Sequence, residues 1–279
     1  MYIKCWGSRG SIPVSGPEYH KYGGDTTCVE IRTKSGELII VDAGTGMRRL
    51  GNQLTIEGCR RFNVLFTHSH WDHLLGFPFF KPLFDPESEI RIYRCPFPGK
   101  FVETIVTKMM SPPHFPVRYS DLRAKISYVE ACPGSFQIDS VTVTPIALSH
   151  PNNGCGYKFV EDGKVFVFLT DNELGYTHAG GLKFKDYKAF CEGADLLFHD
   201  AEYTPDEYES SVEWGHTTYK DALELALEAG VKRLGLIHHN RDRTDQGIDH
   251  IVNQCRNLIS ERKAGLICFA VGRDMSFEL

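Results

Sequence analysis

The stretch His68-Ser69-His70-Trp71-Asp72-His73 is the most informative part of this chain, because it gathers three imidazoles and a carboxylate within six residues. It follows an apolar run typical of a buried strand, Phe62 to Thr67. The end of a buried strand holds side chains at fixed separations. Imidazole nitrogen and carboxylate oxygen are ligands that suit zinc, manganese or iron. Packing alone does not require so many titratable groups at one strand end, so we interpret the stretch as part of a metal site.

Composition and charge are those of an ordinary globular chain. The 279 residues are 42% hydrophobic and 24% charged, which allows one large domain or two small ones. A formal net charge of -5 is unlike the basic field of a protein that grips nucleic acid through many phosphates. No apolar stretch approaches the roughly 18 residues that a membrane span needs. The chain starts with a strand-like run, and its nine scattered cysteines fit reduced thiols, so we expect a cytoplasmic protein.

Strand and helix signals alternate along the whole chain, which indicates an α/β layered protein. The two best-marked helices cover Thr218 to Ala229 and about Asp245 to Lys263. Shorter helices are expected around Met47 to Leu50 and after His73. The segment 96–117 differs, because it holds five prolines around a helix-like piece. We expect it to be an inserted lid or a dimerisation segment.

Three further strand-like runs end in side chains that could complete the metal site. They end at His150, at Asp171 and at the pair His238-His239. In an open α/β sheet, the strand ends are where sites are built. Taken singly, each of these residues fits an ordinary turn. Taken together with the first stretch, they predict a centre for two metal ions.

The order of these residues resembles the metallo-β-lactamase superfamily of metal-dependent hydrolases. The motif runs His68-x-His70-x-Asp72-His73, His150, Asp171 and His238. Upstream, Val41-Asp42-Ala43-Gly44-Thr45-Gly46 resembles that family's second-strand motif. The resemblance covers the whole chain. It implies one hydrolase domain over residues 1–279, folded as a four-layer αββα sandwich with the metal site at one edge between the two sheets.

The resemblance also implies which side chains would hold two divalent metal ions. One ion would be held by His68, His70 and His150, and the other by Asp72, His73 and His238, with Asp171 bridging both. The histidine count favours zinc, whereas the oxygen ligands would also accept manganese or iron. Two such ions lower the pKa of a bound water and stabilise charge on reacting oxygens.

Two positions near these ligands stay open. His238 fits the family's strand-end histidine better than His239 does, but the sequence does not decide between them. Asp42 either orients ligands through hydrogen bonds or simply caps the turn before Gly44.

A second pair of motifs resembles the phosphodiesterase branch of the superfamily, which includes transfer-RNA 3′-processing endonucleases. The motifs are Leu197-Phe198-His199-Asp200-Ala201-Glu202-Tyr203-Thr204 and Trp214-Gly215-His216-Thr217-Thr218. The resemblance implies that His216 protonates the leaving oxygen or steadies charge on the phosphoryl group, alongside Asp72 at the metals. Asp200 would orient His216. The branch usually has Glu there, so Glu202 is a rival, and His216 could instead only cap the following helix.

We therefore expect a two-metal phosphodiesterase that acts on a small phosphodiester such as a cyclic nucleotide. The superfamily alone does not fix the substrate. The acidic net charge and the lack of a long basic arm argue against a large RNA, so nucleic acid is not the favoured partner. An RNA endonuclease of the transfer-RNA 3′-processing type, a lactone or thioester hydrolase and a metal-stabilised binding module are the alternatives. His114 and nearby aromatic residues could cover a base or form a dimer contact, and a homodimer is an expectation from similar proteins.

Overall fold

The computed structural model describes residues 1–94, 101–131 and 134–279 and contains two sheets. The first sheet includes the strand that leads into the histidine-rich stretch. Its strands are β1 (Tyr2–Gly7), β2 (Cys28–Arg32), β3 (Leu38–Val41), β4 (Arg61–Leu65), β5 (Glu89–Tyr93), β6 (Lys125–Val129) and β14 (Ser276–Glu278). Their order is β14-β1-β2-β3-β4-β5-β6. Neighbours from β3 to β6 run parallel, and the remaining pairs are antiparallel.

The second sheet is built from the later part of the chain. Its strands are β7 (Phe136–Ile138), β8 (Val141–Ala147), β9 (Cys155–Glu161), β10 (Lys164–Leu169), β11 (Leu196–Asp200), β12 (Arg233–Ile237) and β13 (Ile267–Ala270). Their order is β13-β12-β11-β10-β9-β8-β7. Strands β10 to β13 are parallel, and β8 points the same way because two antiparallel pairings through β9 separate it from β10. The carboxyl ends of β8, β10, β11 and β12 therefore lie at one edge.

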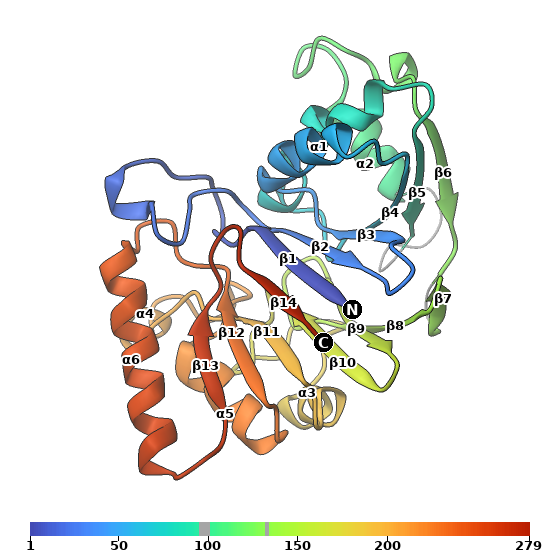
Figure 1. The fold of residues 1–279 in the computed structure, drawn as a ribbon. Coiled ribbons are helices and arrows are strands. Elements are labelled where there is room, and N and C mark those ends of the chain that lie inside the picture. The colour runs from blue at the N-terminus through green and yellow to red at the C-terminus, as the bar shows by residue number, and fades with distance from the viewer. Residues whose placement is uncertain (95–100, 132–133) are drawn as a thin grey trace.

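Helices cover the outer faces of both sheets, as Figure 1 shows. They are α1 (Gly46–Ile56), α2 (Phe101–Met109), α3 (Phe184–Cys191), α4 (Pro205–Tyr208), α5 (Tyr219–Glu228) and α6 (Asp245–Glu261). One apolar cluster joins α1 and α2 to the first sheet, and another joins α3, α5 and α6 to the second. A third lies between the sheets, where Val41 and Leu65 share a core with Phe166 and Phe198. These layers confirm the αββα sandwich.

The local predictions succeed where a pattern is long. The helices α5 and α6 begin with Thr218 and Thr244 as N-caps, whose hydroxyl groups accept backbone N–H bonds. The helix expected after His73 is wrong. Short 3-10 turns follow instead, at Phe77–Phe79 and Lys81–Phe84, because Pro78 and Pro82 would lie in the interior of a longer helix and break it. The helix α1 is also longer than the expected four residues.

The proline-rich insert contains α2. A 3-10 turn, Tyr119–Asp121, follows the insert. Residues 96–100 of the insert lie outside the described part of the chain, so the structure describes the rest of it. Buried Val102, Val106 and Met110 attach α2 to the core of the first sheet. Its role as a lid or a dimer contact stays a prediction.

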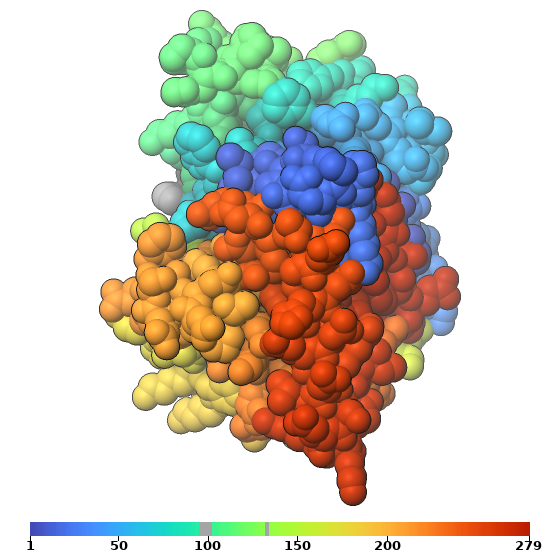
Figure 2. Space-filling view, turned by 90° about the vertical axis from the view of Figure 1, so that its left-hand side faces the viewer, coloured from blue at the N-terminus to red at the C-terminus, as the bar shows by residue number. Residues whose placement is uncertain are grey.

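The segment between β1 and β2 reaches across to the second half of the molecule, and Figure 2 shows it in blue against the orange and red C-terminal region. The fully buried Arg9 guanidinium donates hydrogen bonds to the carbonyl oxygens of Asn240, Arg243 and Gly23. The segment therefore fixes the loop after β12 to the loop after β1. None of the described helices is long and apolar enough to cross a membrane. The seven cysteines within the described residues are free thiols.

Candidate metal centre

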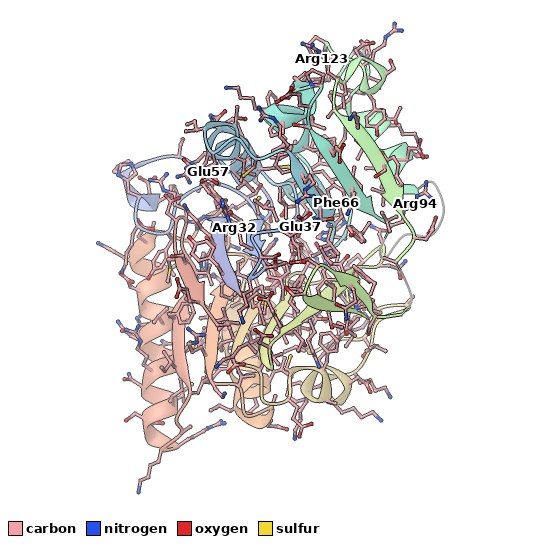
Figure 3. The ribbon with its side chains drawn as sticks, turned by 45° about the vertical axis from the view of Figure 1, so that its right-hand side comes forward. Arg32, Glu37, Glu57, Phe66, Arg94 and Arg123 are labelled. Atoms are coloured by element: carbon pink, nitrogen blue, oxygen red, sulfur yellow. The ribbon has the colours of Figure 1, made fainter. Side chains whose placement is uncertain are left out.

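The end of β4 carries the histidine-rich stretch into the space between the two sheets. The Phe66 ring, labelled in Figure 3, is buried and fixes the backbone just before His68. A 3-10 turn, Trp71–His73, then brings Asp72 and His73 back under the strand end. The amide N–H of Ala43 donates to the His73 carbonyl oxygen, which ties this turn to the loop after β3.

Three groups of side chains meet at this edge, and each gathers its potential ligand atoms within 4.8 Å of one another; one of them joins Asp200 and His216 to Asp171 and His238. The first group, called here the histidine cluster, contains His68, His70, His150 and Asp171. The second, called the mixed cluster, contains Asp72, His73, Asp171 and His238. Asp171 belongs to both, so all seven predicted ligands come together around one shared carboxylate.

The distances within the histidine cluster are those of side chains that face one another. His70 Nδ1 lies 3.1 Å from His150 Nε2. Asp171 Oδ2 lies 3.5 Å from His68 Nε2 and 4.0 Å from His150 Nε2. His68 and His150 are almost fully buried, and burial lowers the pKa of His68 well below its usual value and that of His150 to about 3. Both imidazoles are therefore neutral, as metal coordination requires.

The mixed cluster has a similar spacing but more carboxylate oxygen. His73 Nε2 lies 3.3 Å from Asp72 Oδ2 and 3.2 Å from Asp171 Oδ1. His238 Nε2 lies 3.1 Å from Asp72 Oδ2. Burial lowers the pKa of His73 and His238, but the surrounding carboxylates outweigh it and hold both values well above the usual one.

Unsatisfied nitrogen atoms show that these residues fit metal ions. The Nε2 atoms of His68 and His73 are buried and have no hydrogen-bond partner among the described residues. A buried polar atom without a partner costs free energy unless an ion or water satisfies it. Both atoms belong to the clusters that surround Asp171. The donor set of imidazole nitrogens and carboxylate oxygens is the one that zinc takes in proteins.

The backbone turns sharply where the strands deliver these residues. Asp42, Asp171 and His238 have φ angles of 62°, 52° and 60°, which lie in the left-handed region. Such conformations cost free energy and gather at functional sites, where the surrounding structure holds them. Each residue follows a buried strand directly or within one residue, so the turn swings its side chain towards the sheet edge.

The two adjacent histidines after β12 point in different directions. His238 faces Asp72, whereas His239 Nε2 donates a hydrogen bond to the carbonyl oxygen of Val271, at 2.8 Å. Burial lowers the pKa of His239 to about 3, which keeps it neutral in the core. His239 therefore packs away from both clusters.

Asp42 contacts the site through hydrogen bonds. Its Oδ2 lies 2.8 Å from His73 Nδ1, and its two oxygens also accept bonds from the amide and the hydroxyl group of Thr67. The carboxylate thus holds His73 with Nε2 pointing towards the mixed cluster. Of the two alternatives for Asp42, the geometry matches ligand orientation.

His216 lies beside the clusters and pairs with Asp200. Its Nδ1 is 2.7 Å from Asp200 Oδ2, and its ring stacks on His238 with centroids 4.6 Å apart. Burial lowers the pKa of His216, but Glu202 and Asp200 outweigh it and raise the value to about 9. Glu202 accepts a hydrogen bond from His238 Nδ1 at 2.9 Å and lies 3.6 Å from His216 Nε2. Asp200 is thus the hydrogen-bonded partner of His216, and Glu202 that of His238.

Glu173 is a site residue that the sequence did not reveal. One of its oxygens accepts bonds from the Tyr208 hydroxyl group and the Glu213 amide, and the other from the Gly215 amide and His178 Nε2. These bonds fix the loop before His216. The Gly215 carbonyl in turn accepts a bond from His150 Nδ1 at 2.9 Å. A side chain at Gly215, whose φ is 90°, would collide with His150.

The loop after β1 is a second contributor that sequence reasoning missed. The Ser11 amide donates to Asp72 Oδ2 at 2.8 Å, with a Ser11 φ of 62°. A Cβ at Gly10 would lie 2.4 Å from the His238 ring, so only glycine allows this close approach. Gly10 is the local sequence signal here, and a glycine does not point to a metal ligand by itself.

An open pocket of about 420 Å³ exposes the centre to solvent. Its lining residues come from the loop after β1, the histidine-rich stretch and the second sheet: Ser11, Ser69, His70, Trp71, Asp72, Asp171, His216 and His238. None of these described lining residues is a lysine or an arginine. A ligand that enters the pocket thus meets both clusters and His216 together.

Comparison with known proteins gives the family. The family model described as beta-lactamase superfamily domain matches residues 38–239. A curated relative, Ribonuclease Z of Thermococcus kodakarensis, is 25% identical over 269 residues, which cover 80% of this chain and 82% of the relative.

Solved structures show the same fold. The metallo-beta-lactamase fold protein YhfI of Bacillus subtilis aligns with a TM-score of 0.74 and 15% identity, covering 100% of this chain and 98% of its own. A diphosphatase from the PhnP family aligns with a TM-score of 0.70 and 17% identity, covering 100% and 97%. With the sandwich fold and the shared carboxylate between two ligand clusters, the family match shows that this chain belongs to the beta-lactamase superfamily and is a metal-dependent hydrolase.

Proposed function

We propose that the protein is a phosphodiesterase with two metal ions that cleaves a small phosphodiester, such as a cyclic nucleotide. The observation that carries the proposal is the His216–Asp200 pair, because its His216 ring lines the same pocket as His70, Asp72, Asp171 and His238 of the two clusters. A diester needs a proton donor for its alkoxide leaving oxygen, whereas a thioester, which expels a thiolate, has less need of one.

The proposed ligands are those of the two clusters. His68, His70 and His150 would hold one ion, Asp72, His73 and His238 the other, and Asp171 would contact both. We propose zinc as the resident metal, because imidazole nitrogen dominates the donor set. Bound ions would lower the pKa of a water molecule and stabilise negative charge on the phosphoryl oxygens. Because both sheets contribute ligands, we propose that residues 1–279 form a single hydrolase domain.

His216 would supply the proton for the leaving oxygen. Asp200 engages Nδ1, so Nε2 is the nitrogen that can carry a proton to the substrate. The carboxylates of Glu202 and Asp200 outweigh burial and raise the pKa of the ring to about 9, which favours the protonated form that a general acid needs. Asp200 keeps the ring oriented while the proton leaves. The pair therefore supports general acid catalysis as the role of His216.

The pocket supports a small substrate over a large RNA. Its volume of about 420 Å³ falls in the range of sites for small molecules. Without a lysine or arginine among its described lining residues, it offers little to a chain of phosphates. The net charge of -5 points the same way.

The test is the variant His216→Ala, assayed, after metal analysis, on cyclic AMP, whose alkoxide leaving group needs a proton. We expect about two metal ions per chain, as in the unaltered protein, and a loss of kcat of about 10²- to 10⁴-fold. The matched control is His250→Ala, an exposed histidine on α6, which should change neither quantity. Unchanged turnover by His216→Ala with both metals bound would contradict the role of His216.

A second candidate is RNA cleavage of the transfer-RNA 3′-processing type, because the curated relative is named Ribonuclease Z. It predicts that a precursor transfer RNA is cut far faster than any small diester. A competition assay that holds both substrates at equal concentration separates the two functions. Rapid turnover of an acyl lactone without diester cleavage would instead favour an ester hydrolase, and bound metal without any hydrolysis a binding module.

A further inference from the structure

A second, apolar pocket lies next to the metal centre, between the histidine-rich stretch and the proline-rich insert. Its volume is about 500 Å³. One wall consists of Trp71, Leu74, Leu75 and Phe79, and the other includes Met109 and Phe115. A pocket of this size with apolar walls is typical of sites that bury a small organic ligand.

Trp71 connects this pocket with the metal centre. It lines both pockets and stands in the chain between the proposed ligands His70 and Asp72. Its side chain is 76% exposed, and that of Phe79 is 55% exposed. Both line the same apolar pocket, and exposed apolar side chains that gather in one place mark binding sites, unlike single ones. A group that occupies the apolar pocket would therefore lie directly beside a phosphate at the metals.

The walls are held in place before any ligand arrives. The Phe79 and Phe115 rings meet edge to face, with centroids 5.6 Å apart and planes at 89°, and so join the two segments. The amides of Leu74 and Leu75 both donate to the Trp71 carbonyl oxygen. On the other wall, buried Val106 anchors α2 to the first sheet. A ligand thus meets a preformed surface and loses little free energy in ordering it.

We propose that this pocket binds the planar ring of the substrate's non-leaving group, so that the substrates are nucleoside phosphodiesters. The inference rests on the proposed phosphodiesterase function. Every nucleobase has a π-face, and stacking on aromatic side chains tolerates differences between bases. Lys108 and His114 also line the pocket and supply the polar groups that a base or a sugar needs at its edge.

A second copy of the chain is the competing occupant of these apolar side chains. Such a copy would also cover Trp71 and therefore crowd the opening over the metal centre. The pocket is concave and shares Trp71 with that opening, which suits one end of a bound diester better than a flat contact between proteins. The experiment below distinguishes the two occupants.

Two substrates with the same leaving group isolate the effect of the ring. They are thymidine 5′-(4-nitrophenyl phosphate) and methyl 4-nitrophenyl phosphate. The measured quantity is kcat/KM for the thymidine diester divided by kcat/KM for the methyl diester. In Trp71→Ala and Phe115→Ala we expect this ratio to fall about tenfold, the loss that removal of one stacking side chain causes. Trp71→Phe should restore most of it. The control Ile56→Ala alters a side chain that is 80% exposed on α1 and should leave the ratio unchanged.

Binding without catalysis makes the test independent of the reaction. Calorimetric titration with thymidine 5′-monophosphate should show weaker binding by about tenfold in Phe115→Ala. If the unaltered protein cleaves neither diester but binds the nucleotide through Phe115, the proposed function fails and the pocket assignment stands. An unchanged kcat/KM ratio and unchanged nucleotide binding in both alanine variants would overturn the assignment. Conversion of a dimer to a monomer by Phe115→Ala with an unchanged ratio, seen by sedimentation velocity, would assign the pocket to a second copy instead.

Discussion

The two ligand clusters share Asp171 but differ in what holds their histidines. In the mixed cluster, His73 and His238 each bond through Nδ1 to a buried carboxylate, that of Asp42 and that of Glu202. In the histidine cluster, the corresponding partners are neutral oxygens. The Thr67 hydroxyl group lies 3.1 Å from His68 Nδ1, and the Gly215 carbonyl oxygen 2.9 Å from His150 Nδ1.

This difference indicates that one centre can hold two metal sites of unequal affinity. A carboxylate behind a ligating imidazole raises its basicity and fixes its orientation, whereas a neutral oxygen mainly fixes its orientation. The pKa values differ in the same sense, raised for His73 by carboxylates that outweigh burial and lowered for His150 mainly by burial. We expect the mixed cluster to bind its ion more tightly.

The variant with the largest expected effect removes what the clusters share. Asp171→Asn takes one charge from both, so we expect loss of metal from both sites and a fall in diester hydrolysis beyond the roughly 10- to 100-fold typical of outer partners. Elemental analysis and the rate on methyl 4-nitrophenyl phosphate measure this. The control is Asp162→Asn, at an exposed turn whose φ of 50° resembles that of Asp171. Retention of one full metal equivalent would show that Asp171 serves only one site.

A pair of variants tests the inequality directly. Glu202→Gln and Asp42→Asn should each lower the affinity of the mixed cluster for its ion by about 10- to 100-fold and leave the histidine cluster nearly unchanged. Stepwise titration with a chelator, followed by metal analysis, gives the two affinities. In the unaltered protein the first ion to leave should be that of the histidine cluster. If both affinities fall equally in these variants, while the exposed control Glu209→Gln changes neither, the clusters are not separate in the proposed sense.

The smallest expected effect concerns the loop behind the histidine cluster. Glu173→Gln replaces one of the two acceptor oxygens by an amide nitrogen that donates, so two of the four hydrogen bonds are lost. The Gly215 loop should therefore loosen and move both His150 and His216. We expect both metals to remain and kcat to fall about tenfold, with KM for the methyl diester nearly constant, because small misplacements of reacting groups are costly. A change confined to thermal stability would reduce Glu173 to a structural residue.

The sequence predicts the two sides of the centre with unequal ease. The His68–His73 stretch is visible because its residues are neighbours in the chain. His150, Asp171 and His238 could be found because each follows a buried strand, and parallel strands end at a common edge. Their assembly around one carboxylate matches the expectation, while metal binding itself stays a prediction for the experiments above.

The supporting residues could not be predicted, because their partners are remote in sequence. Glu173 and Gly215 are 42 residues apart, and Ser11 and Asp72 are 61 apart, so no local pattern links them. The same limit applies to two edge strands, which no local pattern marks. β7 and β14 have three residues each and depend on pairing with a neighbour for their conformation. The helix expected after His73 failed for a local reason, the prolines at positions 78 and 82.

The position of the metal centre between the two sheets also affects how strongly the two halves of the sandwich are held together. His70 and His150 are 80 residues apart, and Asp72 and His238 are 166 apart, and in both pairs one member comes from each half of the sandwich. An ion held by such a pair is a clasp between the halves, formed only in the folded chain. Removing it with a chelator should lower the melting temperature and let a protease reach the edge that the ions had closed.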